Sequence, residues 1–122
     1  MRALIVDDSG FTRRVLRGLL EAEGFECSEA ANALGGLDIL RRGESFDVVL
    51  VDWNMPGMSG VEMVKELRRR GFDQVRIMMV TSLCDADGIL QALEAGADEY
   101  LMKPFDGDAL RQKLALMGLE AA

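Results

Sequence analysis

Residues 48–62 read VVLVDWNMPGMSGVE, and the pattern of the whole chain can be followed from this stretch. Its first four residues, Val48–Val51, are all apolar, which is typical of a strand in a parallel sheet covered by helices on both faces. Asp52 follows where that strand should end. Ser59 and Glu62 stand at the spacing of a capping box, so a helix is predicted to begin there. The stretch is therefore one strand–loop–helix unit.

The same unit recurs along the chain. Ala3–Val6 and Val75–Val80 are further nearly unbroken apolar runs, whereas Phe25–Glu29 alternates apolar and polar residues, which suits an edge strand. The short run Tyr100–Met102 is predicted as the other edge. Five such units joined by right-handed crossovers build an α/β fold, a doubly wound (βα)5 five-stranded parallel sheet. Three doubly covered strands and two edges agree with the spatial order 2-1-3-4-5.

Helices are predicted between the strands because apolar residues recur there at intervals of three and four. The predicted apolar stripes are Val15, Leu16, Leu19 and Leu20; Leu34, Leu37, Ile39 and Leu40; Val61, Val64 and Leu67; Ile89, Leu90 and Leu93; and Leu110, Leu114 and Met117. Gly24, Gly43, Gly71 and Gly96 follow the first four of these helices, at the place where glycine commonly ends a helix. Asp106 is predicted to cap the last one.

Composition restricts the kinds of function that are open to the chain. It has 122 residues and a formal charge of −7, so one domain over residues 1–122 is expected, and direct nucleic-acid binding is unfavourable. No apolar run is long enough to cross a membrane, and no secretory signal is visible. Cys27 and Cys84 match no metal or redox spacing, so both are predicted to be reduced thiols that fill space in a cytoplasmic protein.

The chain contains no histidine. Histidine-based catalytic triads and the usual zinc sites are therefore excluded. Any chemistry must therefore use carboxylates, hydroxyls or lysine, for which a hard metal ion is a suitable addition.

Polar side chains stand directly after the predicted strands. Asp7-Asp8 follows the first strand, Asp52 the third, Thr81-Ser82 the fourth and Lys103 the fifth. The carboxyl ends of parallel strands meet at one edge of the sheet, which is where such sheets bind ligands. Taken singly, these residues could equally be helix caps, turn residues or a solvated lysine. Taken together, three carboxylates at adjacent strand ends repel one another unless a cation neutralises them.

Mg²⁺ is the cation that this set of oxygen ligands favours. Lys103 beside such a site indicates that an anion also binds there, and a phosphoryl group is the anion that Mg²⁺ usually accompanies. Asp52 is the middle carboxylate and the best placed nucleophile. Its attack on a phosphoryl group gives an acyl phosphate.

Four motifs resemble those of the receiver domains of two-component response regulators, in particular the single-domain chemotaxis members of that family. They are Val6-Asp7-Asp8-Ser9, the stretch 51–60, Val80-Thr81-Ser82 and Lys103-Pro104-Phe105. The resemblance covers essentially the whole chain, and it implies a flavodoxin-like fold. It also implies that Asp52 is the phosphoacceptor.

The same resemblance implies a set of Mg²⁺ ligands. Asp8 and Asp52 would bind the ion through their carboxylates, Asn54 through its backbone carbonyl and Asp7 largely through a bound water. Lys103 would pair with the phosphoryl oxygens.

A role in switching is implied for two more residues. Thr81 would hydrogen-bond a phosphoryl oxygen, and Tyr100 would then turn into the space that Thr81 leaves. The simpler alternative, that Tyr100 only packs on the edge strand, stays open. The peptide bond between Lys103 and Pro104 is expected to be cis, as in the family.

The partners follow from the resemblance as well. The target protein would bind the surface made by the fourth helix near residues 89–93, the strand Tyr100–Met102 and the last helix near residues 110–117. Because the chain has no histidine, a separate histidine kinase must supply the phosphoryl group. The implied protein is a monomeric phosphoacceptor switch, not an enzyme, that assists its own phosphorylation and dephosphorylation. Asn54 and Leu83 occupy positions that the family uses to tune dephosphorylation.

Three alternatives remain open at this point. A phosphohydrolase with an aspartyl intermediate also uses carboxylates, Mg²⁺ and lysine, although Asn54 stands where such enzymes usually carry a second aspartate. A flavin carrier shares the winding, but this chain has Asp7-Asp8-Ser9-Gly10 in place of a phosphate loop rich in serine, threonine and glycine. The chain could also be the receiver part of a longer regulator.

Overall fold

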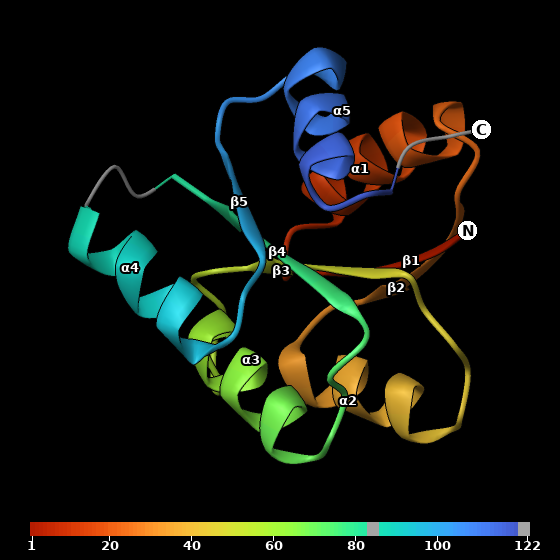
Figure 1. Ribbon diagram of the computed structural model, residues 1–122. Coiled ribbons are helices and arrows are strands. Elements are labelled where there is room, and N and C mark those ends of the chain that lie inside the picture. Colours follow the sequence, from red (N-terminus) through yellow and green to blue (C-terminus); the bar gives the residue numbers. More distant parts are fainter. Residues whose placement is uncertain (83–85, 120–122) are drawn as a thin grey trace.

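The computed structural model describes residues 1–82 and 86–119, and strands alternate with helices along them (Figure 1). The elements are β1 (Arg2–Val6), α1 (Gly10–Ala22), β2 (Glu26–Ala30), α2 (Ala33–Arg41), β3 (Val48–Asp52), α3 (Gly60–Arg69), β4 (Arg76–Thr81), α4 (Ala86–Ala95), β5 (Glu99–Met102) and α5 (Gly107–Leu116). Leu83 and Cys84, on which two of the expectations above depend, lie outside the described residues. Cys27 is partly buried and packs against the core, as expected of a space-filling thiol.

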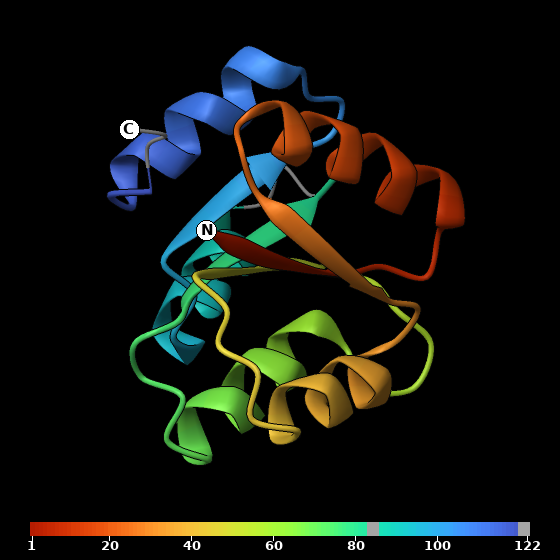
Figure 2. The same cartoon turned by 90° about the vertical axis from the view of Figure 1, so that its right-hand side faces the viewer.

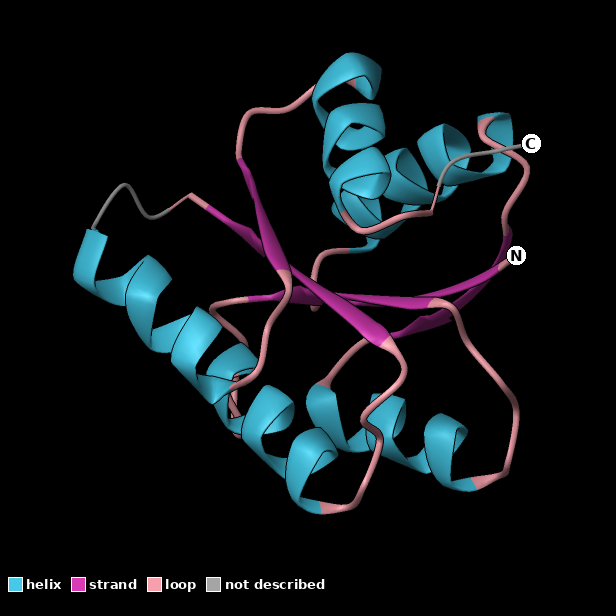
Figure 3. Cartoon of the chain, viewed as in Figure 1, coloured by secondary structure: helices cyan, strands magenta, loops and turns pink. Residues whose placement is uncertain are grey.

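The five strands form one parallel sheet in the order β2-β1-β3-β4-β5, which confirms the predicted order. Helices α1 and α5 cover one face of the sheet, and α2, α3 and α4 cover the other (Figures 1 and 2). Figure 3 shows the strands as a single layer between these two groups of helices. The chain leaves β1 for β2 on one side and later returns to β3 on the other. The carboxyl ends of β1 and β3 therefore flank the point where the winding reverses, which is the usual ligand site of such sheets.

The sheet separates two apolar clusters. Leu4 and Val6 of β1 pack with α2 and α3, whereas Ala3 and Ile5 pack with α1 and α5. The same alternation runs through β3 and β4, whose residues are almost all buried. This burial on both faces is the reason for the unbroken apolar runs in the sequence.

Each predicted strand agrees with an observed one to within one residue at either end. Four strand ends extend beyond the predicted apolar run, because the strand continues into a polar residue: Arg2, Asp52, Thr81 and Glu99. Asp52 and Thr81 are the last residues of β3 and β4, so the polar residues expected just beyond these strands belong to the strands themselves.

The predicted helix stripes are wrong at four positions, because Val15, Leu34, Leu90 and Leu93 are exposed. Small residues face the core instead. In α4, which packs beside α3, Ala92 is buried between the exposed leucines.

In α2 the small core residue is Gly36. A Cβ there would lie 2.9 Å from the Met63 Cε and 2.9 Å from the Val6 Cγ2 atom. Glycine therefore lets this helix approach β1 closely. An apolar stripe indicates that a helix has a buried face. Close contacts of this kind then determine which residues lie on that buried face.

The predicted caps are present. Ser59 and Glu62 form the capping box of α3, each side chain accepting a backbone hydrogen bond at 3.2 Å. Asp106 accepts a hydrogen bond of 2.8 Å from the Ala109 N–H at the start of α5. Gly71 ends α3 with a φ of +89°, a conformation that other residues rarely adopt. Among the described residues, no helix combines the length and apolar composition that crossing a bilayer requires.

Gly60 joins α3 to the end of β3 at very short range. A Cβ on Gly60 would lie 2.3 Å from the carbonyl oxygen of Asp52, 2.9 Å from the Met79 Cε and 3.0 Å from the Trp53 Cα. The Gly60 N–H also donates a 3.0 Å hydrogen bond to the Trp53 carbonyl. The backbone that carries Asp52 is therefore held directly by the first turn of α3.

We expect Gly60→Ala to destabilise the protein by about 1–3 kcal/mol, because the added methyl group must push away backbone that cannot move freely. Gly18→Ala is the matched control, since the Gly18 position on α1 has no atom within 4 Å of an added Cβ. Gly18→Ala should raise the free energy of unfolding by about 0.5–1 kcal/mol, as is usual when alanine replaces glycine within a helix. Urea unfolding measures both; equal effects of the two substitutions would contradict the close approach.

Candidate functional site

Three carboxylates meet at the carboxyl ends of β1 and β3. Val6 of β1 pairs with Val51 of β3, so the residues that follow them, Asp7 and Asp52, lie at neighbouring strand ends. Asp7, Asp8 and Asp52 each offer an oxygen that lies within 4.8 Å of the oxygens of the other two. Asp7 is 1% exposed and Asp52 7%, whereas Asp8 is exposed. Two buried acids and one exposed acid therefore share one small volume.

Lys103 contributes the positive charge of the cluster. Its Nζ lies 3.5 Å from the Asp52 Oδ1 and 3.8 Å from the Asp7 Oδ2. The Lys103 N–H donates a 2.8 Å hydrogen bond to the Thr81 carbonyl, which fixes the backbone of the residue after β5 against the end of β4. The peptide bond from Lys103 to Pro104 is cis, the isomer that the resemblance implies. One ammonium thus faces two buried carboxylates, which leaves an excess of negative charge.

Asp7 is held from several sides. Its Oδ1 accepts a 2.8 Å hydrogen bond from the Ser9 N–H, and its backbone carbonyl accepts one of 2.6 Å from the Arg13 Nη1. The Arg13 Nε also donates to Glu29 of β2 at 3.0 Å. The Asp7 Oδ2 is buried and accepts no hydrogen bond within residues 1–82 and 86–119. Arg13 was not predicted from the sequence, because its role depends on how α1 lies against β2.

The acidity of Asp52 reflects its surroundings. Burial raises the pKa of Asp52 above its ordinary value, and the negative charge of Asp7 raises it further. The Lys103 ammonium and the Asn54 backbone N–H lower the pKa, because both favour the ionised form. The net direction is upward, so the folded protein holds the Asp52 carboxylate at a cost.

A cavity of about 280 Å³ opens beside Asp52 and is lined by Asp52, Trp53, Asn54, Thr81 and Ser82. Thr81 is buried, and Ser82 is exposed. The structure thus brings the predicted residues from β3 and β4 around one space. Tyr100 does not line this cavity; it is partly buried on β5, with the Lys113 ammonium 4.2 Å from its ring centre.

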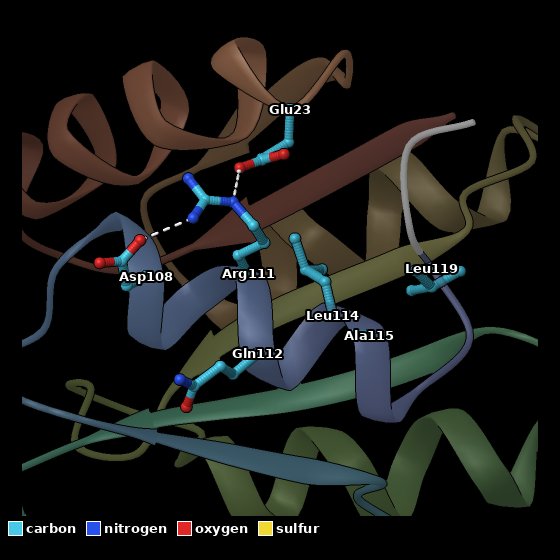
Figure 4. A pocket seen from close by; sticks show the side chains of 7 residues that line it. All are labelled: Glu23, Asp108, Arg111, Gln112, Leu114, Ala115 and Leu119. Carbon is cyan, nitrogen blue, oxygen red and sulfur yellow. Dashed lines mark hydrogen bonds and ion pairs between the residues drawn. The ribbon is translucent and has the colours of Figure 1, made fainter.

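A larger cavity, of about 450 Å³, lies between α1 and α5 and contains none of the predicted site residues (Figure 4). Its polar rim is formed by Arg111, which donates hydrogen bonds of 2.6 Å to Glu23 and 2.6 Å to Asp108. Both carboxylates are therefore engaged with one guanidinium. This arrangement links α5 to the end of α1, which is a structural role. The candidate site is therefore the acid cluster at the carboxyl edge of the sheet, not this cavity.

The acidic cluster has the donor set of a hard divalent cation. Carboxylate oxygens are the ligands that Mg²⁺ prefers. The buried Asp7 Oδ2, which has no hydrogen-bond donor in the described part of the chain, is a group that such a cation would stabilise. The residues therefore fit a Mg²⁺ site. A cavity with a threonine, a serine and a nearby ammonium can also receive an anion.

The chain thus combines a five-stranded parallel sheet in the order β2-β1-β3-β4-β5 with an acid cluster and a lysine at the carboxyl edge of that sheet. The model of the family described as "Response regulator receiver domain" matches residues 3–115, so the chain belongs to the receiver-domain family. It is a response regulator of two-component signalling, and receiver domains are signalling switches. This family assignment favours the receiver over the flavin carrier and the phosphohydrolase.

Chemotaxis proteins are among its relatives. Chemotaxis protein CheY-3 of Vibrio cholerae serotype O1 is 38% identical, with 93% of this chain and 88% of that protein aligned. Chemotaxis protein CheY of Pseudomonas aeruginosa is 36% identical over 93% of both chains. The crystallised CheY4 of Vibrio cholerae superimposes with a TM-score of 0.87 at 31% identity, covering 93% of this chain and 95% of that one.

We expect Asp52→Asn to stabilise the protein at neutral pH in the absence of divalent cations. The pKa of Asp52 is raised by folding, so its contribution to stability is complete below the ordinary pKa of an aspartate and is lost as the pH rises through the folded-state value. Replacing the acid by an amide removes that loss, and the difference between the two proteins should vanish at acid pH.

Urea unfolding in EDTA at several pH values measures this effect. Asp73→Asn is the control, because Asp73 is exposed and outside the cluster. A destabilised Asp52→Asn variant at neutral pH would show that the ionised Asp52 does not lower the free energy of unfolding.

Proposed function

We propose that the chain accepts a phosphoryl group on Asp52 from the phosphohistidine of a separate kinase, in a Mg²⁺-dependent reaction. The observation that carries this proposal is the meeting of three carboxylates within 4.8 Å of one another, with the Lys103 ammonium beside two of them. We take residues 1–122 as one receiver domain that acts as a cytoplasmic monomer. The names of its relatives favour a role in chemotaxis.

Four residues would hold the metal ion. Asp8 and Asp52 would bind through carboxylates, Asn54 through its backbone carbonyl and Asp7 mainly through a water molecule. When bound, Mg²⁺ would neutralise charge among the carboxylates and on the oxygens of the incoming phosphoryl group.

The transfer itself needs an ionised Asp52. A carboxylate oxygen forms the new bond to phosphorus as the bond from phosphorus to the imidazole nitrogen breaks, and the electron pair of that bond returns to the imidazole of the kinase. Lys103 keeps Asp52 ionised and would then pair with the phosphoryl oxygens. The Thr81 hydroxyl, from the same cavity, would donate a hydrogen bond to one of them.

The output surface would be the face of α4, β5 and α5. Leu90 of α4 is 52% exposed and Leu116 of α5 is 72% exposed, and Leu93 adds a third exposed leucine. Exposed leucines on these two helices are side chains that a bound protein partner would cover. Movement of Thr81 toward the phosphoryl group, followed by a turn of Tyr100, would change this surface and thereby its affinity for the target.

Incubation with acetyl phosphate and Mg²⁺, followed by mass spectrometry of the intact chain, tests the assignment. Wild type and the control Asp73→Asn should each gain one phosphoryl group that hydroxylamine removes, as expected of an acyl phosphate. Asp52→Asn should gain none. An equal gain by Asp52→Asn would place the acceptor elsewhere, and rapid sustained release of phosphate would indicate a phosphohydrolase.

Mg²⁺ should stabilise the wild-type fold, because the ion relieves repulsion that exists only in the folded state. At ten times its dissociation constant, Mg²⁺ should add about 1.4 kcal/mol to the free energy of unfolding. Chelation with EDTA should remove this gain, and Asp8→Asn and Asp52→Asn should reduce it strongly. Thermal or urea unfolding with and without Mg²⁺ measures the difference. Equal stabilisation of wild type and Asp52→Asn would argue that the ion binds outside the cluster.

A further inference from the structure

Lys113 of α5 reaches across to β5. Its ammonium lies 4.2 Å from the centre of the Tyr100 ring and 3.0 Å from the Glu99 Oε1. The same Glu99 oxygen accepts a 3.1 Å hydrogen bond from the Tyr100 N–H. Glu99 therefore contacts both the cation and the residue whose ring the cation covers, and it keeps the ammonium in place over that ring.

This contact lies at the open edge of the sheet. Within residues 1–82 and 86–119, β5 is an edge strand, and β4 is its one partner in the sheet. Leu101 of β5 packs in the cluster with α1 and α5, whereas Tyr100 packs against the cluster of α2, α3 and α4 on the other face. Since α5 lies on the first of these faces (Figure 1), Lys113 can meet the Tyr100 ring only around the free edge of β5.

We propose that Lys113 is a positioning residue that retains the Tyr100 ring at the edge of β5, and that Glu99 sets the strength of this retention by orienting the ammonium. The inference rests on the proposed role of Tyr100 in switching. A turn of the ring inward beneath α4 takes it away from α5 and breaks its contact with Lys113. The contact therefore opposes activation.

Partial burial strengthens the contact between Lys113 and Tyr100. The side chains of Lys113 and Glu99 are 24% and 17% exposed, so neither partner is fully solvated. A cation over an aromatic ring in such a place is expected to favour one ring position about two- to fivefold. By thermodynamic linkage, a ligand that prefers the inward ring position then binds more weakly in the presence of Lys113 than in its absence, by the same two- to fivefold factor.

The chain offers a direct probe, because it contains one tyrosine. Full-length protein grown with 3-fluorotyrosine gives a single fluorine resonance from Tyr100. Lys113→Met keeps the apolar stem but removes the cation, and Lys113→Arg keeps the cation. Lys65→Met is the matched control, since Lys65 is exposed on α3.

In metal-free buffer, Lys113→Met should move the resonance toward the position that wild type shows with Mg²⁺ and beryllofluoride, which imitates a phosphoryl group bound to a carboxylate. Lys113→Arg and Lys65→Met should stay near wild type. Glu99→Gln should move the resonance in the same direction by a smaller amount, and it tests the retention without removing the lysine. A resonance that Lys113→Met leaves unmoved, or moves the opposite way, overturns the proposal.

A second measurement separates retention of the ring from a mere change in its surroundings. The single tryptophan, Trp53, adjoins Asp52, so its fluorescence reports beryllofluoride binding in the presence of Mg²⁺. Lys113→Met should bind beryllofluoride about two- to fivefold more tightly than wild type. Lys113→Arg should restore the wild-type affinity, and an affinity of Lys113→Met equal to that of Lys65→Met contradicts the proposal.

Failure of this inference differs from failure of the proposed function. If Asp52 is not the phosphoacceptor, wild type and Asp52→Asn gain the same phosphoryl adduct from acetyl phosphate, or neither gains one, and Trp53 does not respond to beryllofluoride. If only the role of Lys113 is wrong, both responses are present, and Lys113→Met shows them with wild-type affinity and an unchanged fluorine resonance.

Discussion

Repulsion among the acids at the carboxyl edge of the sheet is the constraint on which the rest of the structure depends. A parallel sheet brings the ends of β1 and β3 together, and here both ends carry aspartates. Burial and the negative charge of Asp7 raise the pKa of Asp52, and the Lys103 ammonium offsets only part of this rise. A carboxylate kept ionised against its surroundings is reactive and has affinity for a cation, and these are the two properties that a phosphoacceptor needs.

The surrounding structure holds these groups together by backbone contacts. The first turn of α3 touches the Asp52 carbonyl through Gly60, and the Thr81 carbonyl accepts a hydrogen bond from the Lys103 N–H. Arg13 binds the Asp7 carbonyl from α1. Because the backbone is fixed in this way, the like charges cannot relax apart. The two apolar clusters on either side of the sheet supply the stability that this arrangement requires.

Much of this architecture could be predicted from the sequence, and the parts that could not have clear causes. β1, β3 and β4 are buried on both faces, so their apolar runs are continuous and their polar ends are conspicuous. The helical spacing predicts Leu34 and Leu90 in the core, because it shows an apolar stripe without showing which residues approach the sheet. Arg13 contacts a partner that is distant in sequence, and Lys113 contacts one on the opposite side of an edge strand. No local sequence pattern predicts such contacts.

The burial of Asp7 and Asp52 has a consequence for how such a protein can be altered. Under the proposed function, the stability of the fold and signalling depend on the same side chains with opposite sign, because the buried acids are expected to destabilise the metal-free fold and to take part in phosphoryl transfer. Screening variants for heat resistance alone would enrich neutral residues at these strand ends. Under the proposed function, such variants would be more stable but unable to accept a phosphoryl group, so a search for more stable forms has to select for phosphorylation at the same time.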